Sequence, residues 1–116
     1  MKWYSVIRMD RPAADEVVAE VRAGADSPWF SGHFEGNPIL PGIAQLEMVL
    51  DTIQAFGHTP FRVSGIHKVR FKQMIRPDDT LKIHVRLKDR SPALYSFRVM
   101  VTDQLACSGL LITEAL

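Results

Sequence analysis

Two side chains that could exchange protons with a substrate flank the start of an expected helix. His33 lies in a loop dense in Gly and Pro, and Glu47 lies about one turn inside the helix. A base and an acid in one pocket can carry out an elimination or a hydrolysis. Each residue also has a plainer explanation, because a lone loop histidine is more often a surface or capping residue and a lone helix glutamate is usually solvated. By themselves they indicate only a candidate catalytic pair.

The start of the same helix offers a place for an oxygen that gains negative charge. Gly42 and Ile43 fall in the first turn, where backbone N–H groups have no partner within the helix and point outward at its positive end. Such groups stabilise an enolate or a polarised carbonyl. Glycine also lets a substrate approach the backbone without meeting a Cβ. We therefore expect Gly42 and Ile43 to contact a substrate.

The elements that must position these residues can be predicted from periodicity. Residues 3–9 predict a strand that ends at Arg11-Pro12, and residues 16–23 predict its hairpin partner. Residues 28–42 form a long loop, and long loops are often functional. Residues 41–56 predict one helix, with Pro41 in its first turn. Its predicted apolar stripe consists of Ile43, Leu46, Leu50 and Ile53.

The rest of the chain predicts strands at 61–71, 81–88, 94–101 and 105–116, separated by short turns. Short turns between consecutive strands favour an antiparallel meander. One helix cannot cover about six strands unless the sheet curls around it. The sequence thus predicts a single α+β domain over residues 1–116, with a strongly curved antiparallel sheet around one buried helix.

Composition narrows the classes of function. The 116 residues have a net charge of +1 and are 47% hydrophobic, which gives no overall case for nucleic acid or membrane binding, so a basic partner site must be local. Cys107 is the single cysteine, which excludes an intramolecular disulfide framework and suits a reducing compartment. No signal peptide or membrane span is apparent. We expect a soluble cytoplasmic protein.

Residues 32–47, GHFEGNPILPGIAQLE, resemble the signature of the 3-hydroxyacyl-acyl carrier protein dehydratases of the FabZ and FabA type. The residues in register with it are Gly32, His33, Phe34, Gly36, Pro38, Pro41, Gly42 and Glu47. The likeness runs from about Glu16 to the C-terminus, in a chain shorter than the family's standard members. It implies the hotdog fold, a curved sheet of about six strands wrapped around a central helix. It also implies a homodimer with shared active sites and possible higher assembly.

The resemblance also implies roles for individual residues. His33 would take the proton from C2 of a 3-hydroxyacyl thioester, and a protonated Glu47 would donate to the departing C3 hydroxyl. The N–H of Gly42 would hold the thioester carbonyl. Phe34, Pro41 and Phe71 would help to line the acyl tunnel. No metal or cofactor is implied, and the product would be a trans-2-enoyl thioester on acyl carrier protein.

Three basic residues, Lys68, Arg70 and Lys72, have the same parity on the strand expected at 61–71. They would form either a solvated strand face or, as the resemblance implies, a docking site for the acidic carrier protein. One departure from the family pattern is Glu35, which stands where the family has proline. A carboxylate so close would favour a protonated His33 unless it points to solvent, and alternation in an extended loop favours the solvent direction.

Two other functions stay open on the sequence alone. A hotdog thioesterase would use Glu47 to activate water, although the His33 loop motif argues against it. A non-catalytic acyl-binding partner would keep the loop only for folding. Acyl chain length and the identity of the carrier protein are not encoded in any pattern that we recognise.

Overall fold

The computed structural model describes residues 3–30, 38–57 and 59–116. Six strands, one α-helix and two short 3-10 turns follow one another along the chain. They are β1 (Ser5–Ala13), β2 (Glu16–Arg22), η1 (Pro28–Phe30), α1 (Gly42–Ile53), η2 (Gln54–Phe56), β3 (Phe61–Phe71), β4 (Thr80–Arg90), β5 (Ala93–Val101) and β6 (Gln104–Ala115). In the described part of the chain, no helix is long and apolar enough to cross a membrane.

The six strands form one antiparallel sheet with the order β1-β2-β4-β5-β6-β3. The predicted β1–β2 hairpin and the β4–β5–β6 meander are confirmed. The prediction that β3 belongs to the same meander is wrong, because β3 pairs with β6 at the far edge and β4 pairs with β2. Two edges result, one formed by β1 and the other by β3.

The connection between β3 and β4 explains this crossover. It does not fold back as a tight turn, because its backbone is bound to three other segments. Lys72 N–H donates to the carbonyl of Ala106, Leu40 N–H donates to the carbonyl of Ile75, and Asp78 N–H donates to the carbonyl of Ala23. Ile75 is 1% exposed. The connection therefore crosses the end of the molecule where α1 begins and delivers the chain to β2.

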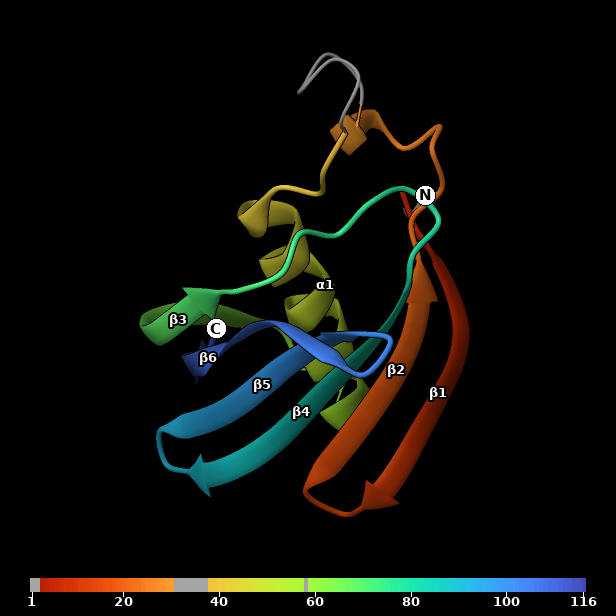
Figure 1. The fold of residues 1–116 in the computed structure, drawn as a ribbon. Coiled ribbons are helices and arrows are strands. Elements are labelled where there is room, and N and C mark those ends of the chain that lie inside the picture. Colours follow the sequence, from red (N-terminus) through yellow and green to blue (C-terminus); the bar gives the residue numbers. More distant parts are fainter. Residues whose placement is uncertain (1–2, 31–37, 58) are drawn as a thin grey trace.

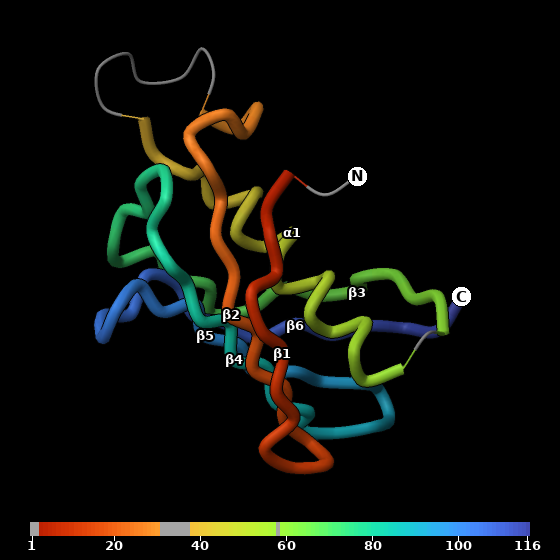
Figure 2. The backbone as a smooth tube through the Cα atoms, turned by 90° about the vertical axis from the view of Figure 1, so that its right-hand side faces the viewer, coloured from red at the N-terminus to blue at the C-terminus, as the bar shows by residue number. Residues whose placement is uncertain are grey.

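The sheet curls around α1, as expected for a single helix that must fill one side of it. In Figure 1 α1 lies behind the sheet, with β3 and β6 to its left and β1 and β2 to its right, and in Figure 2 β1 and β2 run up the view while β3 and β6 run across it. The strict alternation predicted for β4 is confirmed: Leu81, Ile83 and Val85 are at most 1% exposed, and the residues between them face outward. The inner face of the sheet and one side of α1 make the core.

The face that α1 buries differs from the predicted stripe. Its buried side chains are Ala44, Gln45, Met48, Val49, Thr52 and Ile53. Of the predicted stripe only Ile53 is fully buried, whereas Leu46 and Leu50 are half-buried and Ile43 is 65% exposed. The helix is apolar around more than one side, and the sheet covers the side with Ala44 and Val49, where small side chains allow close approach. Among the described residues, the sheet does not cover the other apolar side, which carries the exposed Ile43 and the half-buried Leu46 and Leu50.

Two predicted boundaries also shift. Strand β1 continues through Pro12 to Ala13 rather than ending at Arg11-Pro12. Proline is tolerated because β1 is an edge strand and Pro12 lies in the irregular register between Asp10 and Ala13, where no ladder hydrogen bond needs its N–H. The predicted helix end at Phe56 is confirmed, but its last turn tightens into the 3-10 turn η2.

Candidate active site

Glu47 lies on the exposed side of α1, and its carboxylate is held by a side chain from the start of the chain. The indole Nε1–H of Trp3 donates to Oε2 of Glu47 over 3.0 Å. Forty-four positions separate the two residues in the sequence, so only the fold brings them together. The sequence offered no signal for this contact, because an aromatic residue near the N-terminus predicts a strand equally well.

A second hydrogen bond fastens the same segment one turn further along α1. The hydroxyl of Tyr4 donates to Oδ2 of Asp51 over 2.6 Å. Burial, then the hydrogen bond to Asp51 and the charges of Asp51 and Glu47, raise the pKa of Tyr4 well above its ordinary value. Tyr4 therefore keeps its proton at physiological pH and remains a donor. Trp3 also packs edge-on against Tyr4 at 4.8 Å and against Trp29 at 6.0 Å between ring centroids.

The start of α1 has the geometry that the sequence predicts for an oxyanion site. Pro41 is the N-cap in an extended conformation, and no side chain in the described residues caps the helix. The carbonyl of Pro41 accepts the N–H groups of Ala44 and Gln45. Gly42 and Ile43 lie before those donors, so their N–H groups fall among those for which a helix provides no internal acceptor. The predicted substrate contacts thus lie at an uncapped helix start.

Phe71 lies directly against this helix start. A Cβ built on Gly42 would be 2.6 Å from Cζ of Phe71, closer than real side chains allow. A side chain at position 42 would therefore displace the Phe71 ring, in addition to any effect on substrate approach. Phe71 is 52% exposed and Pro41 is half-buried. The structure brings together Pro41, Gly42, Ile43 and Phe71 from the predicted set; His33 and Phe34, together with Glu35, lie outside the described residues.

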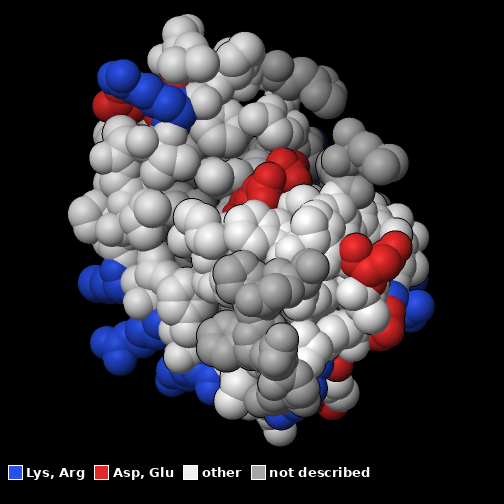
Figure 3. Space-filling model, turned by 90° about the horizontal axis from the view of Figure 1, so that it is seen from above, with Lys and Arg blue, Asp and Glu red and all other residues white. Residues whose placement is uncertain are grey.

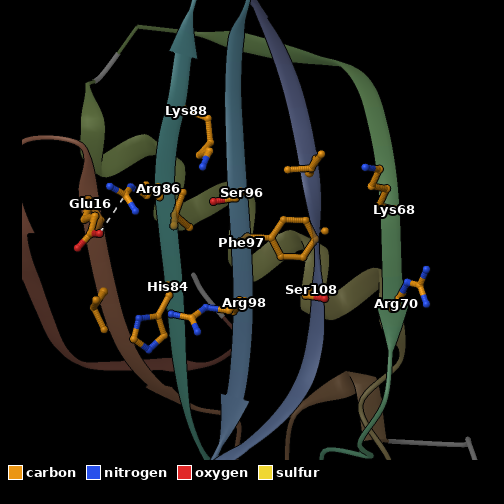
Figure 4. Close-up of a pocket in the computed structure, with 15 residues that line it drawn as sticks. Glu16, Lys68, Arg70, His84, Arg86, Lys88, Ser96, Phe97, Arg98 and Ser108 are labelled. Atoms are coloured by element: carbon orange, nitrogen blue, oxygen red, sulfur yellow. Dashed lines mark ion pairs between the residues drawn. The ribbon is translucent and has the colours of Figure 1, made fainter.

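A separate basic groove of about 590 Å³ crosses the outer face of the sheet, opposite α1 (Figure 4). Its cationic side chains come from three strands, and the hydroxyls of Ser96 and Ser108 lie between them. The cations are Lys68 and Arg70 on β3, Arg86 and Lys88 on β4, and Arg98 on β5, with His84 beside Arg98. One cross-strand row, Arg70–Ser108–Arg98–His84, runs through the groove.

A β-bulge lies in β3 beside the two residues, Lys68 and Arg70, that reach this groove. The β3–β6 register shifts between His67 and Arg70, and Lys68 has φ 56°, the left-handed conformation found at bulges. The prediction that Lys72 shares their strand face is wrong, because β3 ends at Phe71 and Lys72 belongs to the following connection. Lys72 is not among the residues that line the groove.

The groove has more positive than negative charge. Arg86 is paired with Asp15 at 3.3 Å and Glu16 at 3.7 Å. For the other four cations of the groove, the described residues provide no carboxylate within ion-pair distance. Seen from the end where α1 begins, several Lys and Arg side chains project from the lower left flank, where no acidic group is in view, and others lie beside acidic groups at the upper left and on the right (Figure 3). Partial burial, and then the nearby Arg98 and Lys82, lower the pKa of His84, opposed by Glu16.

Comparisons with known proteins agree with this architecture. Residues 9–110 match the model of the ApeI-like family, described as ApeI dehydratase. The chain belongs to this family of dehydratases. The prediction that this protein is a dehydratase is thereby confirmed.

Among the described residues no group of three His, Cys, Asp or Glu side chains is arranged to hold a metal ion.

Two curated relatives carry the name 3-hydroxyacyl-[acyl-carrier-protein] dehydratase FabZ. The protein from Chloroflexus aggregans is 39% identical over 104 residues, which cover 82% of this chain and 72% of that one. The protein from Oenococcus oeni is 30% identical over 121 residues, covering 91% and 86%. The resemblance noted in residues 32–47 therefore extends over most of the chain.

A solved structure confirms the fold. A chain of the dehydratase heterocomplex ApeI:P from Xenorhabdus doucetiae superposes with a TM-score of 0.86 and 29% identity, and the match covers 97% of this chain and 98% of that one. Together with the six-stranded antiparallel sheet around one helix, this establishes the predicted hotdog fold.

The lowered pKa of His84 predicts a pH-dependent loss of stability. The unfolded chain binds a proton at His84 near the ordinary pKa of about 6.5, whereas the folded protein binds it only at lower pH. Between those two values the unfolded state holds more protons, so the free energy of unfolding falls as the pH falls. We expect the urea midpoint of His84→Gln to decrease less than that of the wild type between about pH 7.5 and 5.5.

The exposed His67 on β3 provides the matched control, His67→Gln. Equal pH slopes for the wild type and His84→Gln would contradict the electrostatic description of the groove.

Proposed function

We propose that this protein dehydrates 3-hydroxyacyl thioesters on acyl carrier protein to trans-2-enoyl thioesters. Membership of the ApeI-like dehydratase family and the names of the two relatives support this reaction. The structural observation that carries the proposal is the position of Glu47. Its carboxylate lies on the bare side of α1, less than two turns from an uncapped helix start.

The reaction removes a proton from C2 and hydroxide from C3. His33 acts as the base that takes the C2 proton, and the electron pair moves first into the thioester carbonyl. Glu47, in its acid form, donates its proton to the C3 hydroxyl, which leaves as water while the C2–C3 double bond forms. His33 ends protonated and Glu47 ends ionised, so the charges balance. The reverse sequence hydrates the enoyl product.

The start of α1 stabilises the intermediate stage. Charge develops on the thioester oxygen when C2 loses its proton, and the N–H of Gly42, at the positive end of the helix, would donate to that oxygen. The side chain of Ile43 is 65% exposed and would contact the acyl chain together with Pro41, Phe34 and Phe71. The proposed catalytic groups are the side chains of His33 and Glu47 and the backbone N–H of Gly42.

The exposed apolar surface supports a homodimer with shared active sites. Strand β3 is an edge of the sheet. Four large apolar side chains on this side are more than half exposed: Ile66 (52%) and Phe71 (52%) on β3, Met74 (53%) just after it, and Ile43 (65%) at the start of α1. Surfaces of this kind are usually covered by another chain. We infer that a second copy covers this side and that His33 of one copy works with Glu47 of the other.

An assay that follows two products tests the reaction. The protein is incubated with a 3-hydroxyacyl thioester, and enoyl absorbance and free thiol are recorded together. We expect enoyl product without thiol release. His33→Ala and Glu47→Gln should each lower the rate by about 10²–10⁴-fold, while the exposed control Asp103→Asn, in the β5–β6 turn, keeps it.

Other outcomes identify the alternatives. Release of thiol would indicate a thioesterase, and neither product would indicate a binding protein. The proposed pair is wrong if His33→Ala and Glu47→Gln fold normally and retain the full dehydration rate.

We further propose that the basic groove, through Lys68 and Arg70, docks the acidic carrier protein. The four cations that have no carboxylate partner among the described residues supply charge complementarity. The groove also approaches the candidate site, since Arg70 is followed directly by Phe71, whose ring contacts Gly42. A carrier seated at the Arg70 end would therefore lie at the sheet edge nearest the helix start. Lys72 follows β3 in the connection to β4. It would add to the positive electrostatic potential near the groove without lining it.

Charge removal in the groove should affect carrier-bound substrate alone. We expect Arg70→Ala and Lys68→Ala to raise KM about three- to tenfold for the carrier-bound thioester, with a larger effect at low salt, because exposed charges act mainly on encounter. KM for a short pantetheine thioester should not change. Arg62→Ala is the matched control, since Arg62 lies on β3 outside the groove and is paired with Glu114 at 2.8 Å. Equal changes for both substrates would refute docking in the groove.

A further inference from the structure

We propose that Trp3 is a positioning residue that determines which carboxyl oxygen of Glu47 carries the proton. This inference rests on the proposed function, in which Glu47 is the acid. It concerns a residue that lies outside the signature loop and helix and that no sequence pattern indicated.

The geometry that carries the inference is the hydrogen bond of 3.0 Å from Trp3 Nε1–H to Glu47 Oε2. An indole N–H can only donate. The oxygen that it holds must therefore accept a hydrogen bond. In a protonated carboxyl group the carbonyl-type oxygen accepts well. The hydroxyl oxygen accepts less well, because it carries the proton that must be donated elsewhere. The proton of the acid form is thus directed to Oε1. A fixed proton site matters because an acid must present its proton, not its lone pair, to the departing hydroxyl.

The position of Trp3 is itself fixed by its neighbours. Tyr4, the next residue, is 7% exposed and bound to Asp51 at 2.6 Å. Asp51 follows Glu47 by four positions, so the two carboxylates lie one above the other on the same side of α1. The consecutive residues Trp3 and Tyr4 therefore hold two consecutive turns of the helix. Trp29 packs edge-on against the other side of the Trp3 ring system, with 6.0 Å between centroids.

The same contact could merely fasten the chain to α1, and two measurements separate the possibilities. The first tests the hydrogen bond directly by NMR. The protein has two tryptophans, so its spectrum contains two indole N–H resonances. We expect Glu47→Ala to move the Trp3 resonance, and the spectrum of Trp29→Phe identifies which of the two resonances belongs to Trp3. A Trp3 resonance that does not respond to Glu47→Ala overturns the proposal.

The second measurement is a kinetic double-mutant cycle on the full chain. Trp3→Phe keeps an aromatic ring and removes the donor. We expect kcat to fall about three- to tenfold, the usual size for loss of a hydrogen bond to a neutral partner, with KM within about twofold. In a Glu47→Gln background, Trp3→Phe should cause no further loss, because the group that it positions is gone.

The outcomes distinguish this inference from the proposed function. If Glu47→Gln loses activity and Trp3→Phe lowers kcat equally in both backgrounds, Trp3 has only a structural role and the inference alone fails. If Glu47→Gln retains the full rate, both the catalytic assignment and this inference fail. Thermal unfolding of each variant checks that the loss of kcat does not come from unfolding.

Discussion

The structure depends on one constraint: a single helix must fill the inner side of a six-stranded sheet. Ala44, Met48 and Val49 of α1 are completely buried, and the sheet can reach them only by curling around the helix. Because the sheet encloses one side of α1, the opposite side stays uncovered. That uncovered side carries Glu47 and Ile43, so the packing of the core decides where the candidate site lies.

The curvature also separates two kinds of surface. Alternation along the strands sends apolar side chains inward and basic ones outward, as in β4. Lys68 and Arg70 of β3 add two cations to the outer face at the sheet edge. Substrate chemistry is thereby proposed on the helix side and carrier docking on the outer side, and the end of β3 joins them, where Arg70 faces the groove and Phe71 contacts Gly42.

Local features of this fold were predictable from the sequence, and long-range features were not. The helix, the alternation of β4 and the importance of the Gly42 turn follow from periodicity and backbone chemistry within a few residues. The place of β3 at the far edge depends on hydrogen bonds of the 72–79 connection to distant segments, which no local pattern contains. The choice of the Ala44–Val49 side as the buried one is also set by tertiary packing, because the sequence makes α1 apolar on both sides.

The candidate site shows the same division. Residues 41–47 and Phe71 were indicated by motif and spacing, and the structure places Phe71 against Gly42. Trp3 and Tyr4 were missed as members of the site, because hydrogen bonds between the N-terminus and the middle of the chain leave no periodic trace. The role of Lys72 was overestimated because β3 ends at Phe71, one residue before it.

The central claim is that α1 presents Glu47 on a bare face so that a second copy completes the active site. Co-expression of His33→Ala and Glu47→Gln chains with different tags, followed by isolation of the mixed dimer, tests it directly. In a shared site each mixed dimer has one intact His33–Glu47 pair, so we predict that it recovers about half of the wild-type dehydration rate, whereas each variant alone is inactive. A mixed dimer no more active than the separate variants would contradict the account.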